Sequence, residues 1–412
     1  MIKAIIWSIT LLFSFSYSIT LQEVIKLAEE RATQIKLSQL DLQKVQAQIK
    51  EVKSNLYPKI VLNGNYSRID KNLNTGFTLE NQYRASISVI QKVFDKTVFE
   101  SLKYAKQSIK LQKAIKNQIK TKVIDTAQRL YFAVLLRKSI LGLKKETLNY
   151  WKKNLEYTQE KFNVGLTNKF NLLRTKAQYN LALSDYRQAL SDYKKALIDL
   201  KRFLFLQEIT PPQEDLKKLS FKKIDFSKIE KKNPELLVYK EKINVAQKQI
   251  DVAKATNYPT LELQAEYRTF NTIRFPELKE FWLKGYTISL NFNFVIYDGM
   301  QKKSKIIQSK IDKLKEELNL KDKVEKLKGE YEKILEDINT LETKLEALKI
   351  NLEASKEALN LSTERYKYGL TDIIEVLDSQ RAYDEAYIQY LLNLYNYDMK
   401  VFDLHLLTGY EF

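Results

Sequence analysis

Cysteine is absent from this chain of 412 residues, which excludes disulfides, thiolate metal sites and thiol nucleophiles. Histidine occurs once, as His405 within a run of leucines, where a packing role is expected rather than a catalytic or zinc-binding one. Nine glycines and six prolines are few for a chain of this length, and a compact α/β enzyme needs many turns. We therefore expect long uninterrupted elements, and we expect no enzymatic activity, cofactor or metal.

The chain is strongly basic, with a formal net charge of +18. Of its 69 basic residues only 12 are arginine, so the excess charge is lysine spread over solvated faces. An arginine-rich patch that reads phosphates is missing. Nucleic acid is therefore not an expected partner.

The most apolar segment stands at the start of the chain. Lys3 precedes an apolar run at 4–13, and Ser16 and Ser18 supply small residues before Ile19. This pattern predicts a secretory signal peptide at 1–18. The alternative is a membrane anchor, but the run is shorter than the ~20 residues that a spanning helix requires. Later in the chain no apolar stretch reaches 18 residues, so the exported protein is expected to be secreted, periplasmic or a β-barrel.

Landmarks in the first half of the chain recur in the second half, in the same order and at nearly constant spacing. Tyr57-Pro58 recurs as Tyr258-Pro259, Val93-Phe94-Asp95 as Ile296-Tyr297-Asp298, and Gly165-Leu166-Thr167 as Gly369-Leu370-Thr371, with offsets of 201, 203 and 204. Two copies of one supersecondary unit are the simplest explanation.

Each copy is predicted to contain a helix, two strands, a long helix, a tight turn and a returning helix. The domains are then a first repeat at 19–206, a linker at 207–233 with Pro211-Pro212 that is expected to pack around the middle of the molecule as an equatorial region, and a second repeat at 234–412. In the first repeat we expect a helix at 20–56, strands at 59–69 and 82–94, and helices at 97–161 and 168–206. In the second we expect a helix at 235–257, strands at 260–270 and 285–297, and helices at 300–366 and 372–409.

The long helices have the periodicity of coiled coils. Apolar residues at 324, 327, 331, 334, 338, 341, 345, 348 and 352 alternate spacings of three and four, which is a strict heptad seam. At about 1.5 Å per residue each long helix is roughly 100 Å in length and needs partners to bury its seam. Gly165 and Gly369 are expected to end helices in the left-handed conformation. Asp372 with Glu375 is expected to cap the returning helix.

The predicted strands alternate apolar and polar residues, as at 286–294, where Tyr286, Ile288 and Leu290 interleave with Thr287 and Ser289. A soluble sheet on a hydrophobic core shows the same alternation. Strand length, aromatic residues near the strand ends and a hydrogen-bonding polar face favour transmembrane strands. Four strands cannot close a barrel, and open edges are not tolerated in lipid, so several chains must pool their strands. A polar lumen favours at least three.

Taken together, the signal peptide, the repeated helix–strand–strand–helix–turn–helix unit and the closing Leu-Leu-Thr-Gly at 406–409 resemble the TolC-like outer-membrane efflux proteins. The motifs that carry the resemblance are Leu56-Tyr57-Pro58, Phe162-Asn163-Val164-Gly165-Leu166-Thr167, Val295-Ile296-Tyr297-Asp298-Gly299 and Arg365-Tyr366-Lys367-Tyr368-Gly369-Leu370-Thr371. The resemblance implies a homotrimer with a 12-stranded β-barrel in the outer membrane and an α-helical tunnel in the periplasm. It also implies a periplasmic adaptor and an inner-membrane transporter of the RND, ABC or MFS type as partners.

The resemblance also assigns roles to residues at the helical turns. Gly165, Leu166, Thr167, Gly369, Leu370 and Thr371 match the tip where adaptors engage. Glu375 and Asp378 match acidic positions at the closed aperture, where three chains would present six carboxylates; the alternative is a solvated helix face. Tyr366 matches a tyrosine that ties the inner hairpin shut, but Asn171 stands where an aspartate is common and Thr371 where an arginine can occur. The closing latch is therefore expected to be weaker or different in this chain.

The function that we expect is a passive exit duct of a tripartite efflux or type I secretion system, opened at the periplasmic tip by its partners. The alternative is a non-conducting structural coiled-coil protein of the cell envelope. Both need the heptads, but only the duct needs strands that face lipid.

Overall fold

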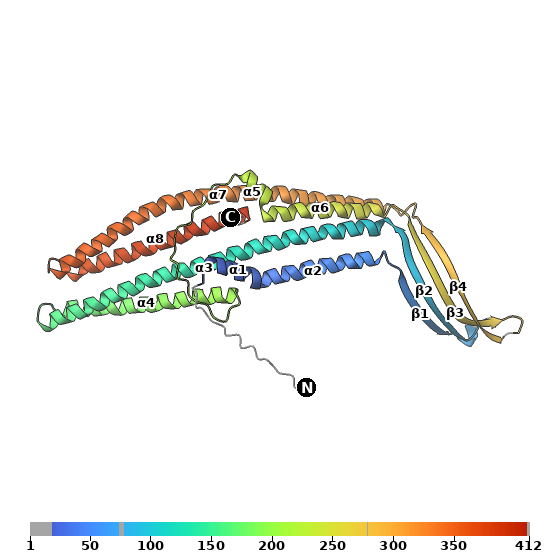
Figure 1. Ribbon diagram of the computed structural model, residues 1–412, viewed down its shortest axis with the longest axis horizontal. Helices are drawn as coiled ribbons and strands as arrows, with labels where there is room; N and C mark the ends of the chain where they lie inside the picture. Colours follow the sequence, from blue (N-terminus) through green and yellow to red (C-terminus); the bar gives the residue numbers. More distant parts are fainter. Residues whose placement is uncertain (1–18, 74–77, 278, 410–412) are drawn as a thin grey trace, which may run out of the picture. The chain divides into compact units, whose positions relative to one another are not determined.

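The computed structural model describes residues 19–73, 78–277 and 279–409, so the predicted signal peptide at 1–18 lies outside the described residues. The described chain is mainly helical with one small sheet (Figure 1). It divides into two compact units. Unit 1 comprises the residues up to 36, 119–233 and those from 326 onward, and unit 2 comprises 37–118 and 234–325.

Unit 2 contains the four strands, which form one antiparallel sheet in the order β1-β2-β3-β4. The bounds are Lys59–Arg68 for β1, Asn81–Asp95 for β2, Thr260–Arg274 for β3 and Lys279–Asn293 for β4. Each repeat supplies one hairpin, and the two hairpins join where β2 pairs with β3, as at Ile87 opposite Tyr267. Pro58 and Pro259 precede β1 and β3 and end the helices before them, because the residue before a proline avoids the α conformation.

The second hairpin differs from its predicted bounds of 260–270 and 285–297. β3 runs on to Arg274 and β4 already begins at Lys279, since the two strands stay paired in register through Arg274 opposite Lys279. β4 ends at Asn293, which pairs with Thr260, the first residue of β3. Residues 294–297 therefore pair with no strand in the described part of the chain and lie outside the sheet.

The helices before the strands lie at the start of each repeat. In the first repeat the single helix expected at 20–56 is two helices, α1 (Leu21–Arg31) and α2 (Thr33–Ser54). Ala32 interrupts them with a ψ of 128° and is 1% exposed. Alanine favours helix, so this break comes from tertiary packing, which seats α1 in unit 1 while most of α2 belongs to unit 2. The corresponding helix of the second repeat is α6 (Pro234–Ala255).

Unit 1 contains two helical hairpins. The first joins the end of α3 (Lys96–Asn163) to α4 (Lys169–Phe203), and the second joins the end of α7 (Gln301–Lys367) to α8 (Ile373–Thr408). Aromatic side chains link the hairpins, with the rings of Phe132 and Phe402 4.9 Å apart edge to face. Four positions of the heptad seam of α7 are buried, namely Leu327, Tyr331, Ile338 and Leu345. No helix in the described ranges is both long enough and apolar enough to cross a bilayer.

The segment between the repeats is more ordered than a simple linker. Residues 226–232 form α5 (Phe226–Lys232), and a short 3-10 helix η1 (Lys71–Leu73) follows β1 in the other half of the chain. Contacts to the helices of unit 1 hold the segment: Lys138 Nζ donates to the carbonyl of Gln213 at 2.7 Å, and Tyr331 donates to the carbonyl of Ile224. The segment was expected to pack around the middle of the molecule, but the helix α5 was not predicted within it.

Candidate functional site: the sheet face and the helical tips

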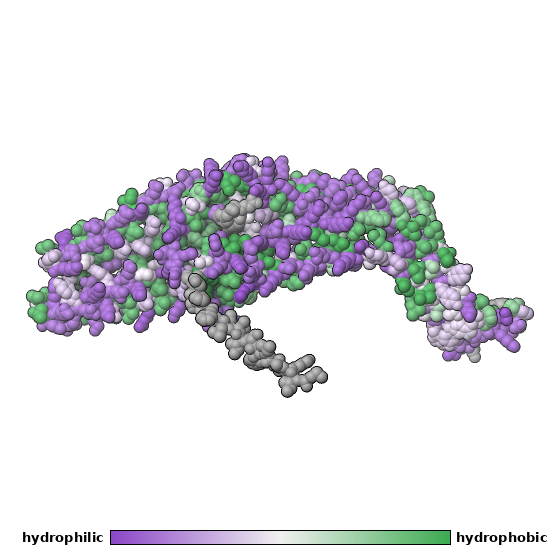
Figure 2. Space-filling view, in the orientation of Figure 1, coloured by the Kyte–Doolittle hydropathy of each residue, from purple (hydrophilic) through white to green (hydrophobic). Residues whose placement is uncertain are grey.

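One face of the sheet in unit 2 is apolar and exposed. Its side chains are Ile60 and Leu62 on β1, Ile87 and Val89 on β2, Leu263 and Tyr267 on β3, and Tyr286, Ile288, Leu290 and Phe292 on β4. We call this set the apolar face. Exposure runs from 40% at Val89 to 79% at Leu62, and Figure 2 shows hydrophobic surface over the strands. A soluble sheet buries its apolar side. An apolar face that is exposed instead indicates a sheet whose apolar side contacts lipid or a hydrophobic partner.

The opposite face carries polar side chains at the same levels. Glu266 of β3 lies between Ser88 of β2 and Thr287 of β4 in the register, and Gln264 lies opposite Ser289. Ser86 and Ser88 of the inner strand β2 are 7% and 4% exposed, whereas Thr287 of the edge strand β4, on the same polar face, is exposed. Hydroxyl, amide and carboxylate groups on this face are suited to a hydrated interior rather than to a hydrophobic core.

Aromatic residues mark the end of the apolar face that is remote from the helices. Tyr66 and Tyr83 have ring centroids 5.1 Å apart, and Tyr83 stacks against Trp282 at 6.2 Å. Asn271, 6% exposed, ties this level together: its side-chain oxygen accepts from the backbone N–H of Tyr83, and its amide donates to Glu280. A row of tyrosine and tryptophan is typical of a membrane–water interface.

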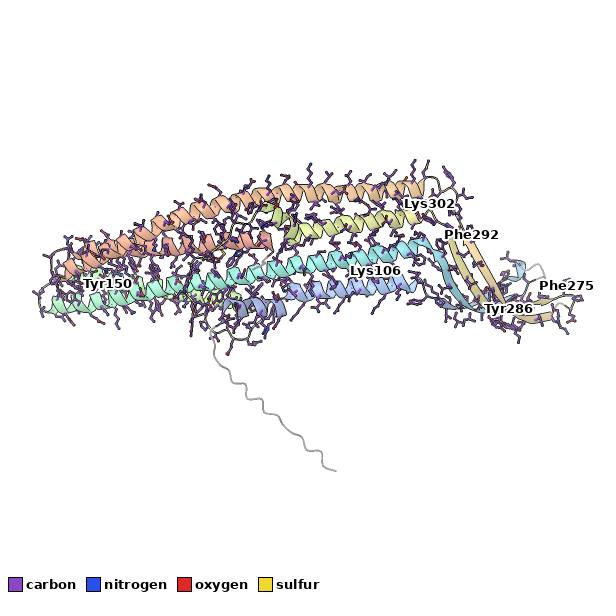
Figure 3. The ribbon with its side chains drawn as sticks, turned by 45° about the horizontal axis from the view of Figure 1, so that its top comes forward. Lys106, Tyr150, Phe275, Tyr286, Phe292 and Lys302 are labelled. Carbon is purple, nitrogen blue, oxygen red and sulfur yellow. The ribbon has the colours of Figure 1, made fainter. Side chains whose placement is uncertain are left out.

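The height of the apolar face matches a bilayer. Trp282 and Phe292 stand ten residues apart on β4, and Figure 3 shows Phe292 and Tyr286 along the strand with Phe275 beyond its far end. At roughly 3.3 Å per residue, ten residues span about 33 Å. A tilt of about 45° reduces this to about 23 Å, close to the ~25 Å apolar band of outer-membrane barrels. β1 and β4 are the edges of this sheet, so lipid requires further strands beside them.

The two helical turns of unit 1 share one backbone design. Gly165 and Gly369 have φ of +75° and +71°, the left-handed conformation in which glycine avoids a Cβ clash. In the first turn Leu166 N–H donates to Lys161 and Gly165 N–H to Phe162, and the second turn repeats this pattern. These are Schellman motifs, which satisfy the last carbonyls of α3 and α7. They leave Leu166 and Leu370 about 70% exposed at the two tips.

The returning helices are capped differently in the two hairpins. Asn168 caps α4, its side chain accepting from Asn171 N–H at 2.9 Å. Asp372 occupies the same position before α8 but makes no capping bond with its side chain. The predicted pairing of Asp372 with Glu375 as a cap is thus wrong, because the Glu375 carboxylate instead binds Arg365 at 2.9 Å and the hydroxyl of Thr371.

The residues predicted for the aperture lie near the tips but not in one cluster. Tyr366 is 9% exposed and packs with Trp151, Ile373 and Val376, in a group of side chains from both hairpins. Asn171 instead donates from its side chain to Thr167 within its own hairpin, at 3.3 Å. Tyr366 is therefore held by apolar packing and by a neighbouring lysine, Lys161, whose ammonium lies 5.7 Å from the centre of its ring.

The two predicted aperture carboxylates differ in their surroundings. Glu375 is half-buried and ion-paired with Arg365 of its own chain. Asp378 is exposed and raises the pKa of Arg381, although the hydrogen bond from Arg381 to Glu385 contributes more to that shift. Of the two carboxylates, Asp378 is the more exposed.

Polar contacts that join the two hairpins were not predicted. The hydroxyl groups of Tyr150 on α3 and Thr363 on α7 lie 2.9 Å apart, and burial raises the pKa of Tyr150, which stays a neutral phenol. Lys144 of α3 meets Asp384 of α8 with Nζ and Oδ2 3.4 Å apart. The one local signal for the second contact is that Asp384 continues the buried stripe of Ile373 and Val376, where an apolar residue is the norm.

Comparison with known proteins agrees with this geometry. The chain matches the family described as outer membrane efflux protein over residues 24–204 and 226–410. It is 21% identical to the outer membrane protein TolC of Escherichia coli, with 93% of this chain and 81% of TolC covered.

Solved structures show the same fold. The CmeC outer membrane channel of Campylobacter jejuni superimposes with a TM-score of 0.78 at 18% identity, over 96% of this chain and 89% of that one. The MtrE outer membrane channel of Neisseria gonorrhoeae, in its open state, gives 0.77 at 20% identity, over 94% and 88%. The match to the family spans most of the chain in both repeats, and this protein belongs to the outer membrane efflux protein family, with its place in the outer membrane.

Proposed function

We propose that the protein is the passive exit duct of a tripartite efflux or type I secretion system. Three copies would each supply β1–β4 to one 12-stranded barrel and their long helices to a periplasmic tunnel. The observation that carries the proposal is the exposed apolar face, with polar side chains on the opposite face, on a sheet with two open edges. Twelve strands leave a water-filled lumen, whereas eight leave an interior filled by side chains.

A non-conducting coiled-coil protein of the envelope is the alternative that the heptads allow. Such a protein has no need of strands whose apolar side chains are as exposed as Ile60 at 72% and Tyr286 at 78%. In water this surface would drive aggregation. The exposed sheet therefore favours the duct.

The partners are proposed to engage at the tips of unit 1. Gly165, Leu166, Thr167, Gly369, Leu370 and Thr371 form two exposed turns of equal design. Beside them Val164 is 70% and Tyr368 76% exposed, so each tip offers apolar surface to a helical partner. A periplasmic adaptor joined to an inner-membrane transporter of the RND, ABC or MFS type is the partner that this surface supports. Glu375 and Asp378, with Tyr366 and Asn171 near them, are proposed to line the aperture that such engagement opens.

The test is to purify the protein from outer-membrane fractions and to insert it into planar bilayers. We expect a trimer that dissociates on heating and that gives discrete ionic conductance steps. A control preparation with Ile288→Lys, which places a charge on the apolar face, should fail to insert. A soluble elongated oligomer that produces no ionic conductance in bilayers would overturn the proposal.

A further inference from the structure

A cluster of charged and polar side chains connects the two hairpins of unit 1 above the tips. Lys144 of α3 lies with Nζ 3.1 Å from Asp185 of α4 and 3.4 Å from Asp384 of α8. Thr147, one helical turn along α3, donates its hydroxyl to Asp384 at 3.0 Å, and Gln380 donates its amide to the same carboxylate at 2.8 Å. Asp384 thus receives donors from both hairpins.

The central pair of this cluster is largely shielded from water. The side chains of Lys144 and Asp384 are 17% and 12% exposed, whereas Asp185 is 57% exposed. Removing one partner of a shielded pair leaves an uncompensated charge and is strongly destabilising, whereas exposed pairs contribute little. The contact between Lys144 and Asp384 is therefore more shielded than a second ion pair between α3 and α8, farther from the tip, in which Arg129 and Asp403 lie 2.6 Å apart and are 28% and 34% exposed. Asp185 adds a weaker contact within the first hairpin.

A cavity of about 430 Å³ lies beside the cluster and is lined by Lys144, Asp384, Arg174 and Arg381 among others. If α8 moves away from α3, water from this cavity can hydrate both members of the pair. Separation then exchanges an ion pair for two hydrated charges, rather than for two charges in an apolar interior. The two charges are therefore stabilised in both states, by each other when the hairpins are together and by water when they are apart.

The apolar group at the tip side of the cluster has no such second state. Trp151 and Ile373 are fully buried there and lose contact area as the hairpins separate. The apolar group sets a steady cost for opening, whereas the charged pair adds a discrete barrier that a substitution or a partner can remove.

We propose that Lys144 and Asp384 form a lock that holds α8 against α3 while the periplasmic tip is closed, and that comes apart when the tip opens. The inference rests on the proposed exit duct and specifies how its opening is restrained. It places the restraint about 19 residues before the end of α3, roughly 28 Å along the helix from the tip turn. Lys144 and Asp384 are thus positioning residues, which act on the aperture through the helices that carry them.

The lock is tested with two readouts on the full-length trimer. The first is open probability in planar bilayers, compared between the wild type and Lys144→Met. The second uses a single thiol, since the chain has no cysteine of its own: Val376→Cys, fully buried between the hairpins, reports opening by its rate of modification with a water-soluble maleimide. We expect Lys144→Met to raise both quantities roughly tenfold, which corresponds to about 1.4 kcal/mol.

Matched variants separate the lock from a general effect on stability. Lys145→Met removes an exposed lysine from the next position and should change neither readout, whereas Lys144→Arg should restore wild-type behaviour. Asp384→Asn keeps the shape of the side chain and should act like Lys144→Met even if the latter assembles poorly. A lower melting temperature with unchanged maleimide rate and open probability overturns the lock. Faster modification without current in any variant leaves the lock standing and overturns the exit duct.

Discussion

The backbone N–H of Leu219 donates to Oδ1 of Asp398 at 2.9 Å, and the second carboxylate oxygen of Asp398 is buried without a hydrogen-bond partner. Burial is the main reason why the pKa of Asp398 rises from 3.8 to about 7. The hydrogen bond from Leu219 lowers this pKa by less than burial raises it, and Lys218, whose ammonium pairs with Glu342, lowers it least. The segment between the repeats is thus held to α8 by a carboxyl that titrates near neutral pH.

This pKa predicts that Asp398 contributes more to the stability of unit 1 in mild acid than in mild base. A carboxyl whose pKa is higher in the folded state favours folding fully below pH 3.8, and that contribution is lost as the pH rises through 7. At about 1.4 kcal/mol per pKa unit the full change is of the order of 4 kcal/mol per chain. Melting temperatures between pH 3.5 and pH 8 measure it.

Asp398→Asn should flatten this part of the pH profile, because the amide does not titrate. The control is Asp312→Asn, an exposed aspartate paired with Lys315 on α7, which should leave the profile as in the wild type. Equal pH dependence in the wild type and Asp398→Asn would contradict the assignment.

Replacing either tip glycine is predicted to lower the stability of the protein, because both glycines have a left-handed backbone conformation. Gly165→Ala and Gly369→Ala place a Cβ at φ of +75° and +71°, which costs roughly 1 kcal/mol each. In both turns the space that the new Cβ would occupy has no heavy atom within 4 Å, so the cost is conformational rather than steric. Melting of the purified trimer measures it.

Gly142→Ala is the matched control for the tip glycines. Gly142 lies inside α3 with an ordinary backbone conformation and open space around it, so alanine there should stabilise the helix by about 0.5–1 kcal/mol. The same substitution thus has opposite signs at positions 142 and 165. Destabilisation at both would show that crowding, not the left-handed backbone, determines the effect.

Local pattern was sufficient for the parts of the fold that repeat along the chain. The heptad seam of α7 and the alternation in β4 are periodic, so neighbouring residues predict which side is buried. Local pattern is not sufficient at Phe205, which follows α4 and has a φ of 53°. The counterpart of Phe205 in the second repeat is Gly409, with a φ of 80°. A phenylalanine gives no signal for a left-handed turn.

The contacts that join distant segments escaped prediction for the same reason. Lys144 and Asp384 are 240 positions apart, and neither stands in a recognisable motif. Asn271 was expected in an irregular connection, yet it lies in a paired strand and links β2 with β4 through its side chain. Such roles depend on which segments the fold brings together, and one-dimensional spacing does not record that.

The aperture carboxylates are predicted to contribute unequally to ion selectivity. Glu375→Ala with Asp378→Ala should lower the preference for cations in planar bilayers, because three chains would lose six carboxylates. Since Arg365 already pairs with Glu375, Asp378→Ala alone should account for most of the loss. Arg365→Gln should act in the opposite direction by releasing Glu375. Reversal potentials in a salt gradient measure all three, and an unchanged value in the double variant would reject the carboxylate ring.

The sheet offers the sharpest comparison, because adjacent residues on β4 face opposite sides. Ile288 belongs to the apolar face and is 66% exposed, whereas Ser289 lies opposite Gln264 on the polar face. Ile288→Lys should destabilise the assembled trimer by roughly 2–4 kcal/mol per chain, the cost of a lysine near the centre of a bilayer. Ser289→Lys adds the same charge on the lumen side and should assemble normally while reducing cation conductance. The yield of heat-modifiable trimer in the outer membrane measures the first effect and single-channel current the second. If both lysines were tolerated equally in assembly, the two faces could not be in lipid and in water, and the sheet would have to be placed elsewhere.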